Sequence, residues 1–316
     1  MTALPPEPSP GSLAFGIVVG LLGAASSAVS YLVSRHHGTR VAGGGFGILV
    51  RAHVVLGLAC IPLILWLAPR TWPPAAAWLP PLFGSTALYT LGQCIVFAAI
   101  KRVQPSRFAP LLGLKIAILA VIVSLLPGDR LDAQQWIAVG LSVFAAILLQ
   151  RGGASTVAIV TALAACLVFS VSDILIVRLI RALQLGLTAS GEPLGPLAAG
   201  ALAMAVPYAT CGLIATAVLT RLPPGGAAAW SAGVSYAAAW GLAMAGLYVS
   251  FGFVGVVFGN VIQSTRGIMS VVTGAALAHL GWHDLEERVD RSTLAWRTIA
   301  AVLMTIAIAV YAIDLS

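Results

Sequence analysis

Charged residues are scarce in this sequence. Asp, Glu, Lys and Arg together make up only 9% of the 316 residues, whereas soluble domains carry about 25%. Hydrophobic residues make up 59%, and the mean hydropathy is +1.00. A surface covered by water cannot be built from this composition. It excludes a soluble globular domain and makes membrane lipid the expected solvent.

Sequence motifs of metal sites and of common enzymes are also missing. There is no C-x-x-C pair and no His at ligand spacing from a Cys, so we expect no metal and no cofactor. The sequence has no Walker A motif, which argues against a transporter driven directly by ATP. It also has no H-E-x-x-H or G-x-S-x-G motif, so we expect no catalytic residues and no intramembrane enzyme. The cysteines lie singly in apolar runs, as small buried hydrophobic residues do: Cys60, Cys94, Cys166 and Cys211.

A basic stripe and a basic leader are absent too. The net charge is +7, but the Lys and Arg residues are scattered near the ends of apolar runs, which argues against a nucleic-acid partner. Residues 1–11 are rich in Pro and contain no Lys or Arg, unlike the start of a signal peptide. We therefore expect a polar Pro-rich tail over 1–11 and a retained first helix.

Long apolar runs are what the sequence has in abundance. A helix needs about 20 residues to cross the hydrocarbon core of a bilayer. The runs predict an all-α integral membrane protein of about ten transmembrane helices, at 12–34, 46–68, 78–101, 107–126, 133–150, 155–180, 196–219, 229–256, 260–281 and 293–314.

The first five predicted helices weakly resemble the second five. In the same order along both groups, Pro62 falls on Pro207 and Lys115 falls on Arg266. The offset grows only across loops, which favours a duplicated unit, with one copy over 12–150 and the other over 155–314. Because five is odd, the second copy would cross the membrane inverted, and the two repeats would form one transmembrane domain.

Two local features accompany this five-plus-five arrangement. Arg51 stands early in the second predicted helix, and residues 128–136 (GDRLDAQQW) form a polar turn before a Gly-containing helix. With these features the chain resembles the drug/metabolite transporter superfamily, in particular its ten-helix EamA-like branch. The turn has Asp129 where the family usually has Glu.

The resemblance implies a multi-pass transporter of a small-molecule substrate, surrounded by membrane lipid. Arg outnumbers Lys, and Ala and Gly are abundant, which fits a GC-rich bacterial genome, so we expect the cytoplasmic (inner) membrane of a bacterium. The sequence leaves two alternatives for the oligomeric state, a monomer and a homodimer. Orientation is in conflict, because the count of Lys and Arg in alternate loops puts both termini outside, whereas the resemblance puts both in the cytoplasm.

Three ionisable residues are predicted to lie inside helices. Such a group costs several kcal/mol near the bilayer centre unless it faces a polar cavity or a partner. An inverted repeat would place Lys115 and Arg266 on opposite walls of one central cavity, where they would attract an anionic or zwitterionic substrate. The resemblance points the same way, since basic residues on these two helices contact substrate in the phosphate-sugar and nucleotide-sugar branches. Alternatively, each cation pairs with helix ends or with Asp173 and locks the bundle.

Asp173 is the candidate for proton coupling, because burial raises the pKa of a carboxyl group and a nearby cation lowers it. The alternatives are a salt bridge to Arg178 or a position near the end of the sixth helix with ready access to water.

Polar and aromatic residues on the same helices complete the predicted substrate site. They could line the pathway, although packing or a lipid-facing position is as common for aromatic residues. Pro62 and Pro207 are predicted to break the backbone hydrogen-bond ladder and to act as hinges, with simple curvature as the alternative. The added site residues are Asn260, Gln263, Gln93, Tyr89, Trp240 and Tyr248.

The function predicted from these features is secondary transport, as exporter or exchanger, by alternating access around a central cavity. The alternative with the same architecture is a lipid-carrier flippase or a membrane partner protein that transports nothing.

Overall fold

The structure is a computed structural model of the whole chain, and it describes every residue except 1–9, 39, 101–108, 127–130, 150–155, 190, 192, 280–290 and 314–316. The predicted tail over 1–11 and part of the 128–136 turn therefore lie outside the described residues. The described part contains helices and turns and no strand.

The elements follow the predicted order. Those of the first half are α1 (Pro10–Gly38), α2 (Gly44–Leu67), α3 (Ala75–Ile100), the 3-10 helix η1 (Ala109–Leu114), α5 (Lys115–Ser124) and α6 (Ala133–Leu149). Those of the second half are α7 (Thr156–Ala189), α8 (Pro196–Leu219), α9 (Ala227–Val254), α10 (Val256–Ser264), α11 (Arg266–His279) and α12 (Arg291–Ile313).

Two predicted helices are divided, and one is longer than predicted. The fourth consists of η1 and α5, and the ninth consists of α10 and α11, which meet at Thr265. The sixth predicted helix was expected to end near residue 180, but α7 continues to Ala189. The residues beyond Arg181 include Ala, Leu and Gln, which are good helix formers, so the charged residue did not end the helix.

The helices form a membrane-spanning bundle. Six of them, α1, α2, α3, α7, α8 and α9, are long and apolar enough to cross a membrane, and α5, α6 and α12 contain shorter apolar stretches. Hydrocarbon provides no water to satisfy backbone groups, so helices are the structure that such segments must adopt. The protein is a multi-pass integral membrane protein.

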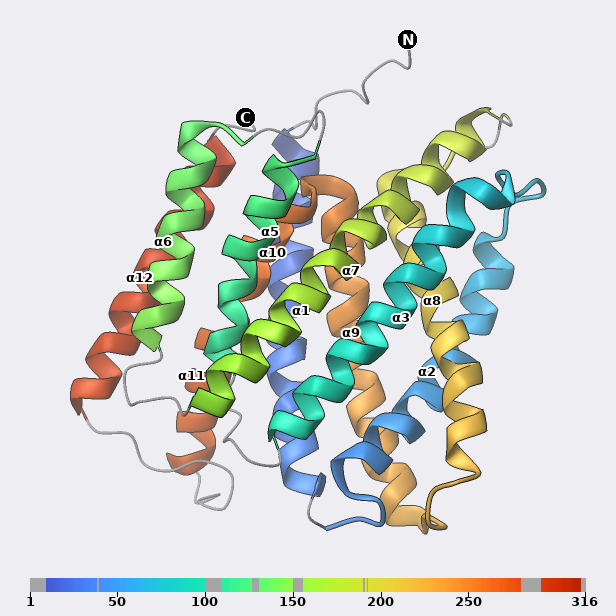
Figure 1. The fold of residues 1–316 in the computed structure, drawn as a ribbon, viewed down its shortest axis with the longest axis horizontal. Coiled ribbons are helices and arrows are strands. Elements are labelled where there is room, and N and C mark those ends of the chain that lie inside the picture. Colours follow the sequence, from blue (N-terminus) through green and yellow to red (C-terminus); the bar gives the residue numbers. More distant parts are fainter. Residues whose placement is uncertain are drawn as a thin grey trace.

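The beginning of α1 and the end of α12 lie at the same end of the bundle, the upper end in Figure 1. We call this the termini end. It also carries Val254 at the end of α9, which packs in one buried cluster with Leu13 of α1 and Tyr311 of α12. The opposite end carries the turns between α1 and α2 and between α8 and α9.

Four helices of the first half pack most extensively on a helix of the second half. The pairs are α1 with α9, α2 with α8, α3 with α7, and α6 with α12. Figure 1 shows α6 and α12 together on one side of the bundle and α2 and α8 on the other. The core is therefore built between the halves rather than within each of them.

Glycine residues lie where the backbones of paired helices come closest together. A Cβ added at Gly57 of α2 would lie 2.7 Å from the Cα of Gly212 on α8, and one added at Gly246 of α9 would lie 2.7 Å from the Cα of Gly23 on α1. Close backbone packing of this kind replaces the hydrophobic effect, which cannot drive helices together in lipid.

The two predicted hinge prolines lie inside continuous helices. Pro62 is in α2 and Pro207 is in α8, and neither helix ends there. Pro62 is exposed on the outside of the bundle, whereas Pro207 is buried. Neither proline divides its helix in this structure, and their role as hinges stays a prediction.

We expect Gly57→Ala to lower the melting temperature of the detergent-purified protein. Overpacking a filled contact costs about 1–3 kcal/mol, and here the contacting atoms belong to the backbone of α8. The measurement is thermal unfolding followed by tryptophan fluorescence. Gly140→Ala is the matched control, because Gly140 is also helical but a Cβ there meets nothing within 4 Å. Equal melting temperatures for the two variants would contradict the close approach.

Candidate functional site

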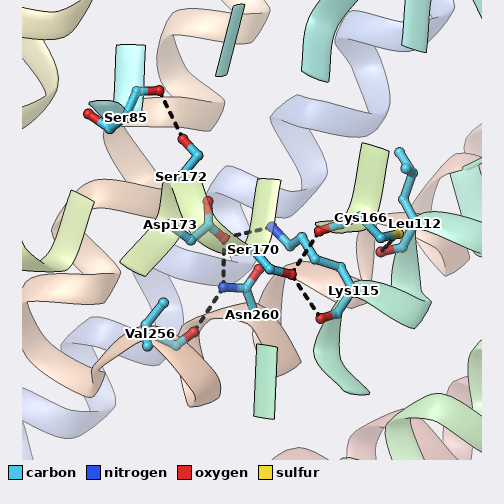
Figure 2. A network of polar contacts seen from close by, with 9 residues as sticks. All are labelled: Ser85, Leu112, Lys115, Cys166, Ser170, Ser172, Asp173, Val256 and Asn260. Carbon is cyan, nitrogen blue, oxygen red and sulfur yellow. Dashed lines mark hydrogen bonds and ion pairs between the residues drawn. The ribbon is translucent and has the colours of Figure 1, made fainter. Parts of the chain in front are cut away.

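A buried ion pair lies in the middle of the bundle. Lys115 Nζ is 2.7 Å from Asp173 Oδ2, and the two side chains are 10% and 6% exposed. Asn260 Nδ2 donates to the same carboxylate oxygen at 2.8 Å. Figure 2 shows the three side chains converging from α5, α7 and α10. The structure thus brings together three of the residues that the sequence predicts for the site.

One face of α7 holds the start of α5 in place. The Ser170 hydroxyl donates to the carbonyls of Cys166 and Lys115 at 2.7 and 3.3 Å. The Cys166 thiol lies 3.6 and 3.8 Å from the carbonyls of Leu111 and Leu112 in η1. Cys166, Ser170 and Asp173 lie near one side of the helix because their spacing of four and three residues matches its period. A thiol, a hydroxyl and a carboxylate therefore contact the divided fourth helix at successive turns.

Asn260 is only partly satisfied. Its Nδ2 also donates to the carbonyl of Val256 at 2.9 Å, which fixes the side chain against its own helix. Its Oδ1 is buried and has no hydrogen-bond partner within the described residues. A buried unpaired acceptor costs about 1–3 kcal/mol, so this oxygen is available to a donor that enters the cluster.

Asp173 differs from its prediction in two respects. It was expected near the end of its helix, but it lies at the middle of α7 because that helix continues to Ala189. A salt bridge to Arg178 was one alternative, but the partner of Asp173 is Lys115, and Arg178 is exposed on the next turn. A mid-helix carboxylate needs a partner in hydrocarbon, and Lys115 provides it.

Arg266 is not part of the ion-pair cluster. It is half-buried at the first residue of α11 and has no hydrogen-bond or ion-pair partner among the residues that the structure describes. Gln263, three residues earlier, is 4% exposed, and its Nε2 is buried without a partner in the described part of the chain. Asp173 neutralises Lys115 but not Arg266, so the two cations are not equivalent in this structure, and the predicted cavity between them stays a prediction.

Lys115 and Arg266 occupy equivalent positions in two divided helices. Each is the first residue of an α-helix that follows an interruption, since Lys115 follows η1 and Arg266 follows Thr265. At Thr265 the backbone N–H donates to the carbonyl three residues back rather than four. Short 3-10 stretches inside helices are found at functional hinges, and divided helices build many transporter sites.

A second polar centre joins α2, α3, α8 and α9. Trp240 Nε1 donates to the hydroxyls of Tyr89 and Tyr208 at 2.7 and 3.0 Å. His53 Nδ1 lies 2.8 Å from the carbonyl of Leu49, and its Nε2 lies 3.0 Å from the Tyr89 hydroxyl. Because a carbonyl can only accept, Nδ1 carries the proton, and in the neutral ring Tyr89 donates to Nε2.

Sequence reasoning missed His53 and Tyr208. His53 stands in the second apolar run, so the rule that selected Lys115 could also have selected it, because histidine is ionisable as well. Tyr208 directly follows Pro207. It is not ionised at neutral pH, so the rule for intramembrane charges could not have selected it.

The other predicted residues belong to this second centre or to the core around it. Tyr89 and Gln93 line a cavity of about 160 Å³ between α2, α3 and α8, together with His53. Trp240 and Tyr248 are buried in the large cluster that fills the space between the halves. Tyr89 and Trp240 stack with ring centroids 6.4 Å apart.

A larger cavity of about 460 Å³ opens at the termini end. Its wall includes Ile174, which directly follows Asp173, and Val256, whose carbonyl binds Asn260. Neither Lys115 nor Arg266 lines it. The cavity is therefore bordered by α5, α7 and the beginning of α10, the same elements that hold the ion pair.

Arg51 ties the two halves together at the opposite end. It is 1% exposed, and its guanidinium donates to the carbonyls of Ala42, Gly47 and Pro223 at 3.2, 3.1 and 3.0 Å. The turn after α1 and the turn after α8 are thereby joined through one side chain. Charge-assisted hydrogen bonds of this kind are strong, so this end of the bundle is held together.

Metal and cofactor sites were not predicted. Among the described residues, no three His, Cys, Asp or Glu side chains gather as a metal site requires. The four cysteines are free thiols.

The first half of the chain matches a known family. Residues 14–151, from α1 to α6, match the model of the EamA-like transporter family. Over these residues the chain is similar to the EamA-like transporter family. The match confirms the predicted resemblance to the drug/metabolite transporter superfamily, whose EamA-like members are membrane transporters.

The comparison with solved structures supports the fold. A search of curated proteins found no match, whereas 27 solved chains are similar in structure. One of them, described only as the crystal structure of a protein, covers 96% of this chain and 96% of its own, with a TM-score of 0.65 and 16% sequence identity. At this identity the likeness concerns the fold alone.

We expect Asp173→Asn and Lys115→Met each to destabilise the protein by about 3–5 kcal/mol, because each leaves one buried charge without its counter-charge. The double variant should lose less than the sum of the two, since no unpaired charge remains. Unfolding in detergent micelles measures all three. Arg221→Gln, which removes an exposed charge, is the control. Additive losses in the double variant would contradict a coupled pair.

Proposed function

We propose that the protein is a secondary transporter that moves a small anionic or zwitterionic metabolite by alternating access around the Lys115–Asp173–Asn260 cluster. The observation that carries this proposal is the ion pair itself, with Lys115 and Asp173 2.7 Å apart and buried. An ion pair inside a membrane protein is expensive to bury, and packing alone would be served better by apolar side chains. Its place between divided helices is typical of transporter sites.

The packing of the halves supports an inverted repeat. If the first half is exchanged with the second, α1 against α9 becomes α7 against α3, and the α2–α8 and α6–α12 pairs become themselves. These four are the pairs with the most extensive contacts. A twofold relation in the membrane plane produces this pattern, and it would let one end open while the other closes. The halves over 12–150 and 155–314 then form one transmembrane domain.

The two ends of the bundle differ in a way that supports alternating access. The termini end has the cavity of about 460 Å³, whereas Arg51 and the turns that it binds join the halves at the opposite end. We infer that this is a state accessible from the termini end. Moving Arg51 away from the Pro223 carbonyl would be needed to open the other end.

Charge balance gives the cluster a mechanism. While Asp173 is ionised, it neutralises Lys115. An anionic group that approaches Lys115 would compete with the carboxylate for this cation, and a proton taken up by Asp173 would remove the competing charge. Binding of substrate and uptake of a proton at Asp173 would therefore be coupled. We place the transporter in the inner membrane of a bacterium.

The transport proposal predicts that Lys115→Ala and Arg266→Ala each reduce substrate uptake roughly tenfold or more, as expected for the loss of about 1.4 kcal/mol of anion binding. The substrate is first found by a thermal-shift screen of metabolites against the purified protein. Uptake is then measured in proteoliposomes, with Arg221→Ala as the matched control. Full uptake by both site variants would remove this assignment.

Proton coupling makes a separate prediction for the variant Asp173→Asn. Its asparagine side chain cannot bind or release a proton. This variant should still exchange substrate across the membrane when substrate is present on both sides. It should lose accumulation driven by an imposed pH gradient, because no proton is carried. Gradient-driven accumulation equal to that of the wild type would show that Asp173 is not the coupling residue.

A lipid-carrier flippase is the second candidate. It is favoured by the cavity of about 160 Å³ between α2, α3 and α8, whose lining includes Phe46, Cys94 and Ile214. All three are exposed on the membrane-facing surface, so this cavity borders the lipid. Movement of a fluorescent lipid between leaflets of proteoliposomes, without uptake of soluble metabolites, would select this candidate.

A further inference from the structure

The wall of the large cavity at the termini end carries two arginines. Arg178 and Arg181 both line the cavity of about 460 Å³. They are three residues apart on α7, so their side chains are neighbours on one face of the helix, about 5–6 Å apart at Cβ. Ile174 and Val177 from the same face also line the cavity. This face of α7 therefore runs from the cavity directly to Asp173.

These two cations have no counter-charge in the described part of the chain. Both are exposed, and neither has a hydrogen-bond or ion-pair partner among the described residues. Among the described residues, no Asp or Glu belongs to the cavity lining. Asp132, three residues before the lining residue Gln135, is not a lining residue. Its carboxylate accepts from the backbone N–H of Gln135 and caps α6.

The rest of the wall suits an anion as well. Gly255, with a φ of 76°, turns the chain directly from α9 into α10, and Val256 and Val257 of the first turn of α10 line the cavity. The first N–H groups of a helix lack partners within it and carry partial positive charge. Those backbone groups add to the positive potential that the two guanidiniums create.

We propose that this cavity is a docking site for an anionic group, a carboxylate or a phosphate, which binds Arg178 and Arg181 before it reaches Lys115. This inference rests on the proposed transport function and deepens it, because it names the substrate class and the end from which the substrate enters. Two guanidiniums one helical turn apart can each donate two hydrogen bonds to such a group. The path from the docking site to the ion pair follows α7 for about two turns.

The test uses the full-length protein in detergent and inorganic phosphate as the probe. Phosphate should raise the melting temperature of the wild type, and its Kd should increase at least tenfold in the double variant Arg178→Gln/Arg181→Gln. Arg70→Gln/Arg221→Gln removes the same charge elsewhere and should bind as the wild type does. An unchanged Kd in the Arg178/Arg181 variant, or equal losses in both variants, would overturn the proposal.

A second arm separates a soluble anion from a lipid headgroup. The same variants are compared in nanodiscs of phosphatidylglycerol and of phosphatidylcholine. An Arg178/Arg181-dependent shift with phosphate supports a soluble anion. A dependent shift seen only with phosphatidylglycerol overturns the entry route for a soluble substrate. Because binding is measured without transport, phosphate binding by a protein that transports nothing would contradict the proposed function and leave the docking site intact.

Discussion

The structure depends on the cost of burying charge in hydrocarbon. Lys115 and Asp173 can lie in the middle of the bundle only because they neutralise each other at 2.7 Å and because Asn260 donates to the same carboxylate. Their helices come from both halves of the chain, so the halves cannot separate at this point without exposing or neutralising a charge. A movement that separates α5 from α7 here would leave two buried charges without their partners, which is costly.

The second polar centre extends this constraint to the other side of the bundle. Ser172, next to Asp173, donates to the carbonyl of Ser85 on α3 at 3.1 Å, and Tyr89 lies one turn further along α3. The ion pair and the Tyr89–Trp240 hydrogen bond are thereby connected through packed backbone. Both centres join a helix of the first half to a helix of the second. Rocking of the halves would therefore strain both centres together.

The sequence predicted the helix order and the intramembrane charges, and it offered the pairing of Lys115 with Asp173 only as one alternative among several. The cost of intramembrane charge selected Lys115 and Asp173, since hydrophobic runs show which residues are out of place. The partner of a buried charge depends on how each helix is rotated about its axis. A helix that is apolar on all sides does not specify this rotation in its sequence. Arg178 was therefore considered as the partner of Asp173. The interruption at Thr265 was missed as well, because no proline or glycine precedes it within α10's last turn to mark it.

Helix α7 carries three groups of polar residues along its length. Towards the opposite end, Cys166 and Ser170 bind carbonyls of the divided fourth helix; at its middle, Asp173 binds Lys115; towards the termini end, Arg178 and Arg181 line the open cavity. An anion moving along this helix would pass from the two arginines to a cation already held by a carboxylate. It can take that cation only if Asp173 gives it up. This order of charges favours entry from the open end and ties release of Lys115 to arrival of the substrate.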